Sequence, residues 1–227
     1  MISGIKKYAL FAVLLMFCLP ILCQPPTLEV GDFLFQDLDC GNLCSAIDQV
    51  TVGYHQSRLS HVAMVVKKKG DQIWLIEANV PQVSLIRLAD FLARSHDAEQ
   101  QPRVLVARLK PPLSLLIPEA LMLAPLFLGH PYNQDFHPNA YSQYCSQLLV
   151  TLFKWANHGV SIFASAPMSF HLDGGTAIHP VWAEYFHHIQ RPVPEGLLGT
   201  NPGMLSLSHH LIIIGQFGIL HQAHVEK

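Results

Sequence analysis

Several features are missing from this sequence of 227 residues, and each absence excludes a class of protein. The apolar run from Ala9 to Leu22 is shorter than the ~20 residues that a single membrane-spanning helix needs. Basic residues form no long stripe beyond Lys67-Lys68-Lys69, which we interpret as a turn between strands, so we expect no nucleic acid partner. We find no internal repeat and no low-complexity tract.

The metalloprotease motif His-Glu-x-x-His is also missing, although fourteen histidines are many for this length. His187-His188 and His209-His210 are adjacent pairs, and neighbouring residues point to different sides of a helix or strand. A zinc site needs three or four convergent ligands. We therefore expect no metal and no other cofactor, and we keep a metal-dependent hydrolase or metal carrier as a minor alternative.

The first 23 residues resemble an export signal. Lys6 and Lys7 form a short basic region, and the apolar run that follows has the length of a signal-peptide core. Gln24-Pro25-Pro26 favours an end of the apolar run at this point. We therefore expect cleavage near Cys23 and export to the periplasm or the extracellular space. Lipid attachment at Cys23 is the weaker alternative, because Leu22 is large for the residue before a lipoprotein cysteine.

Residues 24–227 are long enough for one domain with a sizeable core. Removal of the two signal lysines changes the formal net charge from −2 to −4, with histidines neutral. We expect a single domain with an extension that begins at about residue 163. A long ordered extension after a helix has to pack somewhere, and we expect it to wall a cleft.

Of the five cysteines, three lie beyond the signal: Cys40, Cys44 and Cys145. Export permits disulfides, and Cys40 and Cys44 are close enough in sequence to pair with each other. The alternative is that these cysteines do not pair and are buried as small apolar residues of the core. Pairing of Cys40 with Cys44 leaves Cys145 as an unpaired thiol, which in an exported protein indicates reactivity.

Hydrophobic periodicity predicts strands first and a thiol-bearing helix afterwards. This order favours an α+β fold with an antiparallel sheet. The expected strands are Val30–Phe35, Val62–Val66, Gln72–Ala78, Val83–Arg87, Arg103–Leu109 and an edge strand at Leu211–Ile214. The expected helices are Asn42–Thr51, Leu88–Ser95, Ile117–Leu128 (kinked or ended by Pro125), Cys145–Trp155 and Val181–Ile189.

Three residues in this layout fit the chemistry of a cysteine hydrolase. Cys145 opens the clearest helix, where the helix dipole and a nearby imidazolium lower the pKa of a thiol. His61 begins one strand of a predicted hairpin and Glu77 lies on the other, close enough to hold one ring nitrogen. Taken singly, His61 fits a buried core histidine, Glu77 an exposed strand residue and Cys145 a buried thiol. The combination favours catalysis.

The segments that carry these residues resemble a known family. They resemble the YiiX/YebB-like cysteine hydrolases, of the permuted papain-like branch of the NlpC-type cell-wall peptidase superfamily, in which histidine precedes cysteine. The matching segments are Gly31–Gln36, Ser60–Val65, Ile76–Ala78 and Tyr144–Leu149, with a fifth at Gly199–Ser206. One departure is Gln147, where related sequences commonly carry Glu.

The resemblance implies a permuted papain-like fold and an acyl-enzyme mechanism with Cys145 as nucleophile, His61 as base and Glu77 as orienting residue. The implied substrate has an amide, ester or thioester bond, in a peptide, a peptidoglycan fragment or an acyl lipid, with cell-envelope association. The apolar segment Leu113–Leu128 is a candidate border of an acyl-binding groove, although such a segment is more often core. A non-catalytic binding module on the same fold is the main functional alternative.

Overall fold

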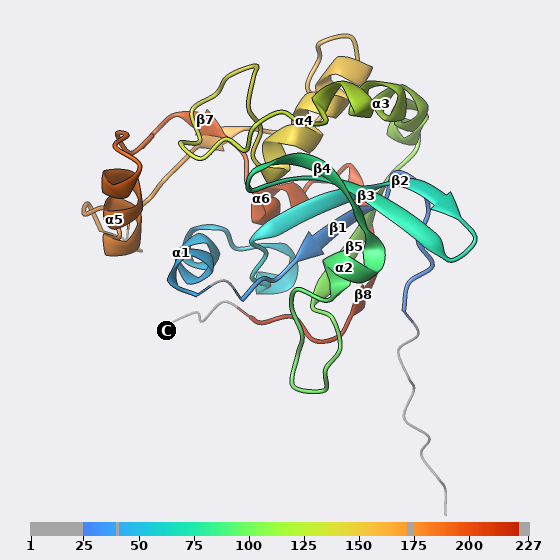
Figure 1. Cartoon of the computed structure of the whole chain (residues 1–227), viewed down its shortest axis with the longest axis horizontal. Coiled ribbons are helices and arrows are strands. Elements are labelled where there is room, and N and C mark those ends of the chain that lie inside the picture. Colours follow the sequence, from blue (N-terminus) through green and yellow to red (C-terminus); the bar gives the residue numbers. More distant parts are fainter. Residues whose placement is uncertain (1–24, 40, 172–174, 223–227) are drawn as a thin grey trace, which may run out of the picture.

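The computed structural model describes residues 25–39, 41–171 and 175–222. Its centre is an antiparallel sheet of six strands in the order β4-β3-β2-β1-β5-β8 (Figure 1). The predicted α+β class with an antiparallel sheet is confirmed. The strands are β1 (Phe33–Gln36), β2 (His61–Lys69), β3 (Gln72–Asn79), β4 (Gln82–Arg87), β5 (Val104–Leu109) and β8 (Leu211–Phe217).

Helices cover both faces of this sheet and one of its ends (Figure 1). No helix in the described ranges is both long and apolar enough to cross a bilayer. The α-helices are α1 (Asn42–Val50), α2 (Leu88–Leu92), α3 (Ile117–Leu123), α4 (Cys145–Ala156), α5 (Pro180–His188) and α6 (Pro202–Ser206). Short 3-10 turns are η1 (Tyr54–Gln56), η2 (Leu113–Leu116) and η3 (Ala124–Phe127).

The expected signal peptide and its cleavage point at Cys23 lie outside the described residues. Cys40 does as well, so its expected pairing with Cys44 is not described, while Cys44 itself is buried in α1. Cys145 is a free thiol.

Alternation of side chains along the central strands divides the core into two layers. Phe33, Val62 and Met64 point to the face covered by α3 and α4. Leu34 and Ala63 point to the other face, which α2 covers through the fully buried ring of Phe91. A sheet covered on both faces gives the continuous apolar runs from which the strands were predicted.

The strand bounds differ from the prediction most at β1, at β2 and at β8, which continues to Phe217. The first begins at Phe33 rather than Val30, because the chain turns at Gly31 (φ 92°) and the Glu29 N–H donates to the Asp32 carboxylate at 2.7 Å. The interpretation of Lys67–Lys69 as a turn is wrong. These lysines extend β2 and pair with Gln72–Trp74 after an irregularity between Val65 and Lys67. Charged side chains are tolerated there because this end of the hairpin is exposed.

The single helix predicted over Ile117–Leu128 is divided into α3 and η3, with Pro125 in the second part. A proline inside a helix removes a backbone donor and clashes with the preceding turn, which explains the division. The α2 helix is shorter than predicted and ends at Leu92.

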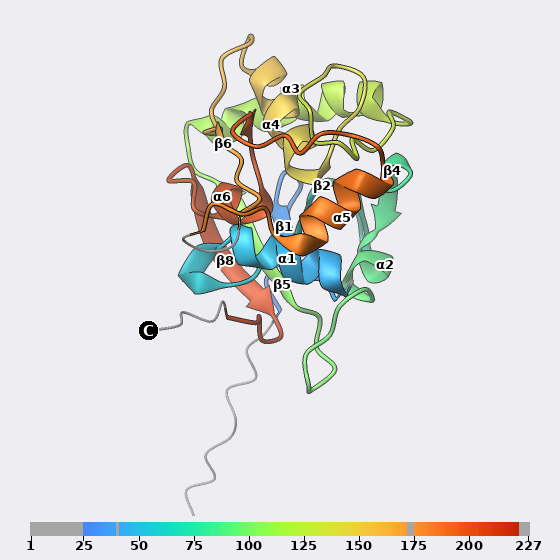
Figure 2. The ribbon, with the colours of Figure 1, turned by 90° about the vertical axis from the view of Figure 1, so that its left-hand side faces the viewer.

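The region after Phe163 contains more structure than one helix and long loops. Figure 2 shows α5 beside α1, and the two pack through a cluster that includes Ala46, Phe170, Trp182 and Phe186. A two-stranded ribbon, β6 (Ala166–Pro167) with β7 (Leu198–Gly199), and helix α6 were not predicted. The side chain of Asn201 caps α6 by accepting a hydrogen bond from the Met204 N–H at 2.7 Å, a recognisable helix-start signal before Pro202.

Candidate active site

Two of the three candidate residues meet on the α2 side of the sheet. His61 is the first residue of β2 and Glu77 lies on β3, and by alternation both share the face of Ala63 and Leu75. The His61 Nε2 atom lies 2.7 Å from the Glu77 Oε2 atom, and both side chains are buried. The predicted cross-strand pairing of the imidazole with the carboxylate is therefore present in the structure.

The Glu77 carboxylate has a second partner that the sequence reading missed. Arg94, just after α2, donates from Nη1 to Oε2 at 2.7 Å and from Nη2 to Oε1 at 2.6 Å. Its guanidinium also lies over the Phe91 ring, 5.8 Å from the centroid. A buried carboxylate needs a paired positive charge. The burial of Glu77 therefore indicates a cationic partner, which the sequence analysis did not assign.

The third candidate, Cys145, is the first residue of α4 and is buried. Its thiol forms a side-chain hydrogen bond with the His61 ring. Because Glu77 occupies Nε2 of that ring, Nδ1 is the nitrogen that remains for the sulfur. The structure thus gathers Cys145, His61 and Glu77, with Arg94 behind them, in one continuous chain of polar contacts.

The contacts among Cys145, His61, Glu77 and Arg94 favour the charged forms of both His61 and Glu77. Burial alone lowers the pKa of His61, but the contacts with Cys145 and Glu77 outweigh it and raise the pKa to about 9. Burial alone raises the pKa of Glu77, but hydrogen bonds from His61 and Arg94 outweigh it and lower the pKa to about 2. At neutral pH the ring is therefore an imidazolium held by a carboxylate.

Gln147 organises the helix start beneath the thiol. Its Oε1 atom accepts hydrogen bonds from the Tyr144 N–H at 3.3 Å and from Asn133 Nδ2 at 3.2 Å. Both bonds need only an acceptor, so the amide oxygen of glutamine serves as a carboxylate oxygen would. Glutamine therefore suits this position, where the family resemblance leads us to expect glutamate.

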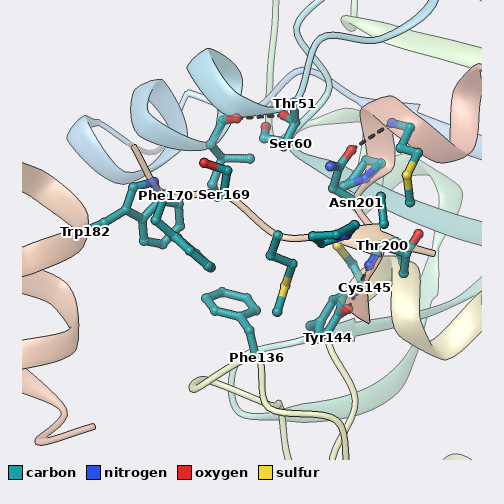
Figure 3. A pocket seen from close by; sticks show the side chains of 18 of the residues that line it. Thr51, Ser60, Phe136, Tyr144, Cys145, Ser169, Phe170, Trp182, Thr200 and Asn201 are labelled. Carbon is teal, nitrogen blue, oxygen red and sulfur yellow. Dashed lines mark hydrogen bonds between the residues drawn. The ribbon is translucent and has the colours of Figure 1, made fainter. Parts of the chain in front are cut away.

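A cavity of about 210 Å³ opens beside Cys145 (Figure 3). One side comes from the region after Phe163, through Met168, Phe170, Trp182 and the β7–α6 connection. This side is bonded to the start of α4, because the Thr200 N–H donates to the hydroxyl of the N-cap residue Tyr144 at 3.1 Å. The region beyond Phe163 therefore forms part of the wall of the cavity.

Segment Leu113–Leu128, a candidate groove border, does not line this cavity. It packs against α4 as a layer of the core, with Ala120, Ala124 and Phe127 buried. Among the described residues, no group of three or more His, Cys, Asp or Glu side chains is arranged to hold a metal ion.

Comparisons with known proteins concern the family and the fold. A family model described as "Permuted papain-like amidase enzyme, YaeF/YiiX, C92 family" matches residues 27–184. The crystal structure of metalloprotein YiiX from Escherichia coli O157:H7 is similar in fold, with a TM-score of 0.66 and 22% sequence identity. That similarity covers 86% of this chain and 99% of the YiiX chain. No curated protein matches.

Proposed function

Because the chain belongs to the YaeF/YiiX family of permuted papain-like amidases, a hydrolase family, we propose that it is a thiol hydrolase with Cys145 as its nucleophile. His61 is the acid and base of the reaction, and Glu77 orients its ring. One observation carries the proposal. The buried His61–Glu77 pair, with 2.7 Å between Nε2 and Oε2, presents its other ring nitrogen to a thiol at a helix start.

In the first half of the reaction, the Cys145 thiolate attacks the carbonyl carbon of an amide, ester or thioester, and a C–S bond forms. The first N–H groups of α4 have no partner inside the helix, and in this proposal they donate to the developing oxyanion. The His61 imidazolium gives its proton to the leaving group as the bond to that group breaks. The product is an acyl-enzyme and a released amine, alcohol or thiol.

In the second half, neutral His61 takes a proton from water, and the resulting hydroxide attacks the thioester carbonyl. The C–S bond breaks, the acid leaves and the thiolate–imidazolium pair forms again. Glu77 stabilises the imidazolium at both stages and keeps Nδ1 directed at the reacting atoms. Arg94 keeps Glu77 ionised and in place throughout.

The decisive test is an electrophilic thiol probe followed by peptide mapping, together with hydrolysis assays on esters and amides. We expect the label on Cys145, no turnover in Cys145→Ala, and nearly none in His61→Ala. Glu77→Gln retains one hydrogen bond and loses less activity. Turnover by Cys145→Ala at the wild-type rate contradicts the proposal, and full biological effect of that variant favours a binding module instead.

A metal-dependent mechanism makes different predictions, and the related YiiX structure is titled a metalloprotein. Here both Glu77 oxygens already accept hydrogen bonds, from His61 and from Arg94, so this donor set does not fit a metal ion. The thiol mechanism predicts inactivation by iodoacetamide without loss of any metal. Stoichiometric zinc after dialysis, with activity that depends on it, favours the metal alternative.

We also propose export to the periplasm or the extracellular space, with envelope-associated substrates, on the strength of the N-terminal pattern alone. Mass spectrometry of the mature protein tests this point. A terminus near Gln24 supports cleavage, a lipid-modified Cys23 supports anchoring, and an intact Met1 contradicts both.

A further inference from the structure

Large apolar side chains are exposed on the outer side of the segment formed by η2, α3 and η3. Of residues 111–129, Glu119 is the only charged one. The exposed fraction is 79% for Leu115, 68% for Met122 and 61% for Leu126. Apolar side chains that gather on the surface of a soluble domain mark a site of interaction. This segment therefore has two faces, one in the core against α4 and one that is available for docking.

The exposed apolar surface continues onto the edge of the sheet. After η3 the chain runs antiparallel to β4, and the Val83 N–H donates to the His130 carbonyl at 2.8 Å. This course brings Leu128, 40% exposed, beside the edge strand that carries Leu85, 47% exposed. Leu85 pairs with Ile76, which packs in the core with α4, so Leu85 and α3 share one face of the sheet. The apolar ridge is the set Leu85, Leu115, Met122, Leu126 and Leu128.

Basic side chains continue this face of the sheet beyond Leu85. Arg87 follows two residues later on β4, and its guanidinium lies 5.3 Å from the centroid of the Trp74 ring. Trp74 pairs in turn with Lys67 of β2, and Lys69 lies two residues further along that strand. The three basic side chains are exposed, and none of them has an ion-pair partner among the described residues. The basic row is the set Lys67, Lys69 and Arg87.

The combination of the apolar ridge with the basic row is typical of proteins that lie on a membrane surface. Apolar side chains enter the boundary between headgroups and acyl chains, while basic side chains attract anionic headgroups. Trp is enriched at the same depth, and Trp74 lies within the basic row. The chain has a formal net charge of −2, so attraction to an anionic surface has to come from a local group of this kind. Glu119 and Asp71 lower the positive charge of this face without cancelling its three basic side chains.

We propose that the apolar ridge and the basic row form one docking surface for a lipid bilayer with anionic headgroups. The ridge enters the boundary between headgroups and acyl chains, and the basic row lies at the headgroup phosphates. The surface consists of side chains from β2, β4 and the η2–α3–η3 segment, so it does not include Cys145, His61 or Glu77. The proposal goes beyond the hydrolase function and does not depend on it.

The test measures co-sedimentation of the exported protein with vesicles of phosphatidylglycerol and with vesicles of phosphatidylcholine. Every protein in the test carries Cys23→Ser, which removes the candidate lipid-attachment residue, and mass spectrometry verifies that the apolar N-terminal run has been cleaved. We expect the partition coefficient to be higher on phosphatidylglycerol by about tenfold or more, since each basic residue near an anionic surface adds ~1 kcal/mol. Added salt should reduce this preference because it screens the charges.

Two variants test the two parts of the surface. Met122→Ser removes an apolar side chain from the ridge, and we expect the partition coefficient to fall by about fivefold on both lipids. Lys67→Gln removes one charge from the basic row, and we expect about a fivefold fall on phosphatidylglycerol but none on phosphatidylcholine. Both side chains are exposed, so the variants should fold, which circular dichroism and the melting temperature verify.

Each variant has a matched control elsewhere on the molecule. Ile219→Ser makes the apolar-to-serine change at a side chain that is 65% exposed, where the backbone N–H is bonded to Asp97. Arg191→Gln removes an exposed basic charge after α5, which lies on the other side of the molecule from α3 (Figure 1). Both controls should leave the partition coefficient unchanged.

The outcomes decide whether a membrane is the partner. Equal partition on the two lipids, or folded Met122→Ser and Lys67→Gln that bind as well as their controls, overturn the proposal. Light scattering without lipid is the remaining measurement. A dimer that Met122→Ser dissociates would show that the ridge joins two copies of the chain, which also overturns it. Labelling of Cys145 by a thiol probe is independent of all these results, so failure of the docking surface is distinguishable from failure of the proposed function.

Discussion

Arg94 and Glu77 form a two-point ion pair, with N–O distances of 2.7 and 2.6 Å, behind the His61 ring. Glu77 is 2% exposed, so loss of Arg94 leaves a buried carboxylate with His61 alone. We predict that Arg94→Gln destabilises the protein by about 2 kcal/mol, in line with hydrogen bonds to charged groups. The pKa of Glu77 should rise, so acid unfolding should begin at a higher pH than in the wild type.

Arg87→Gln is the matched control for this change. Arg87 is exposed and lies over the Trp74 ring, 5.3 Å from its centroid, without an ion-pair partner among the described residues. Its substitution should change the free energy of unfolding by less than about 1 kcal/mol. Urea unfolding of both variants between pH 3 and 7 measures the difference. Equal losses for the two variants contradict the role given to Arg94.

The pKa of His61 should depend on Cys145. Burial lowers this pKa, and the contacts that raise it to about 9 include the thiol as well as Glu77. We therefore predict a lower His61 pKa in Cys145→Ala than in the wild type, with the ring still held by Glu77. NMR titration of the ring protons measures it, and the spectrum of His61→Gln assigns the resonance. An unchanged value means that the sulfur does not contact the ring in solution.

Stability should respond to pH through the same ring, and the direction follows from the raised pKa. The folded-state value of about 9 exceeds the ordinary value of 6.5, so the protonated ring stabilises the fold fully below pH 6.5. That contribution is lost as the pH rises from 6.5 through 9. The pKa of Glu77 is lowered from 4.5 to about 2, so its contribution to stability is lost only as the pH falls below 4.5.

The measurement is the difference in unfolding free energy between the wild type and His61→Gln. We expect this difference to be largest between pH 4.5 and 6.5 and to shrink by pH 9.5. The comparison cancels the other histidines and carboxylates, which titrate in both proteins. A difference that grows with increasing pH contradicts the charged state assigned to the ring.

Gly31 allows the turn before β1 and the close approach of α3. It adopts a φ of 92°, and a Cβ atom there would lie 2.6 Å from the Ile117 side chain. Gly129 has a similar φ of 83° but open space around its Cα. We predict a loss of about 1 kcal/mol for Gly129→Ala, from backbone strain alone, and a clearly larger loss for Gly31→Ala. Thermal unfolding of the two variants compares them directly.

Gln147 should be replaceable by glutamate but not by leucine. Glutamate still accepts from the Tyr144 N–H and the Asn133 amide, and its charge suits a helix N-terminus. Gln147→Glu is therefore expected to be neutral or stabilising by a few tenths of a kcal/mol, and Gln147→Leu to cost about 1 kcal/mol. Chemical unfolding distinguishes the two, and a costly glutamate contradicts the acceptor role.

The pairing of His61 with Glu77 was predictable because a hairpin and two-residue alternation are both local properties of the sequence. The place of Cys145 was predictable for a similar reason, since an apolar stripe of period 3.6 begins there. Neither argument needs the tertiary structure. The comparisons confirm the family and the fold class but do not test the catalytic roles of these three residues.

Arg94 could not be assigned from the sequence, because its contact with Glu77 depends on how α2 packs over the sheet through Phe91. The sequence predicted that the region after residue 163 walls a cleft, but it could not identify the individual residues of that wall. Met168 and Trp182 line the cavity beside Cys145 because the β6–β7 ribbon and α5 pack back across the end of the sheet. Two-residue strands lack the length for a periodic signal, so this ribbon was not predicted.

Strand β8 joins the sheet beside β5, although it is the last element of the described chain. The residues that line the cavity after α4, from Ala166 to Met204, lie in the sequence between α4 and this strand. Pairing of β8 with β5 therefore anchors the far end of the segment that lines the cavity, so this segment is held to the main body of the fold at both ends.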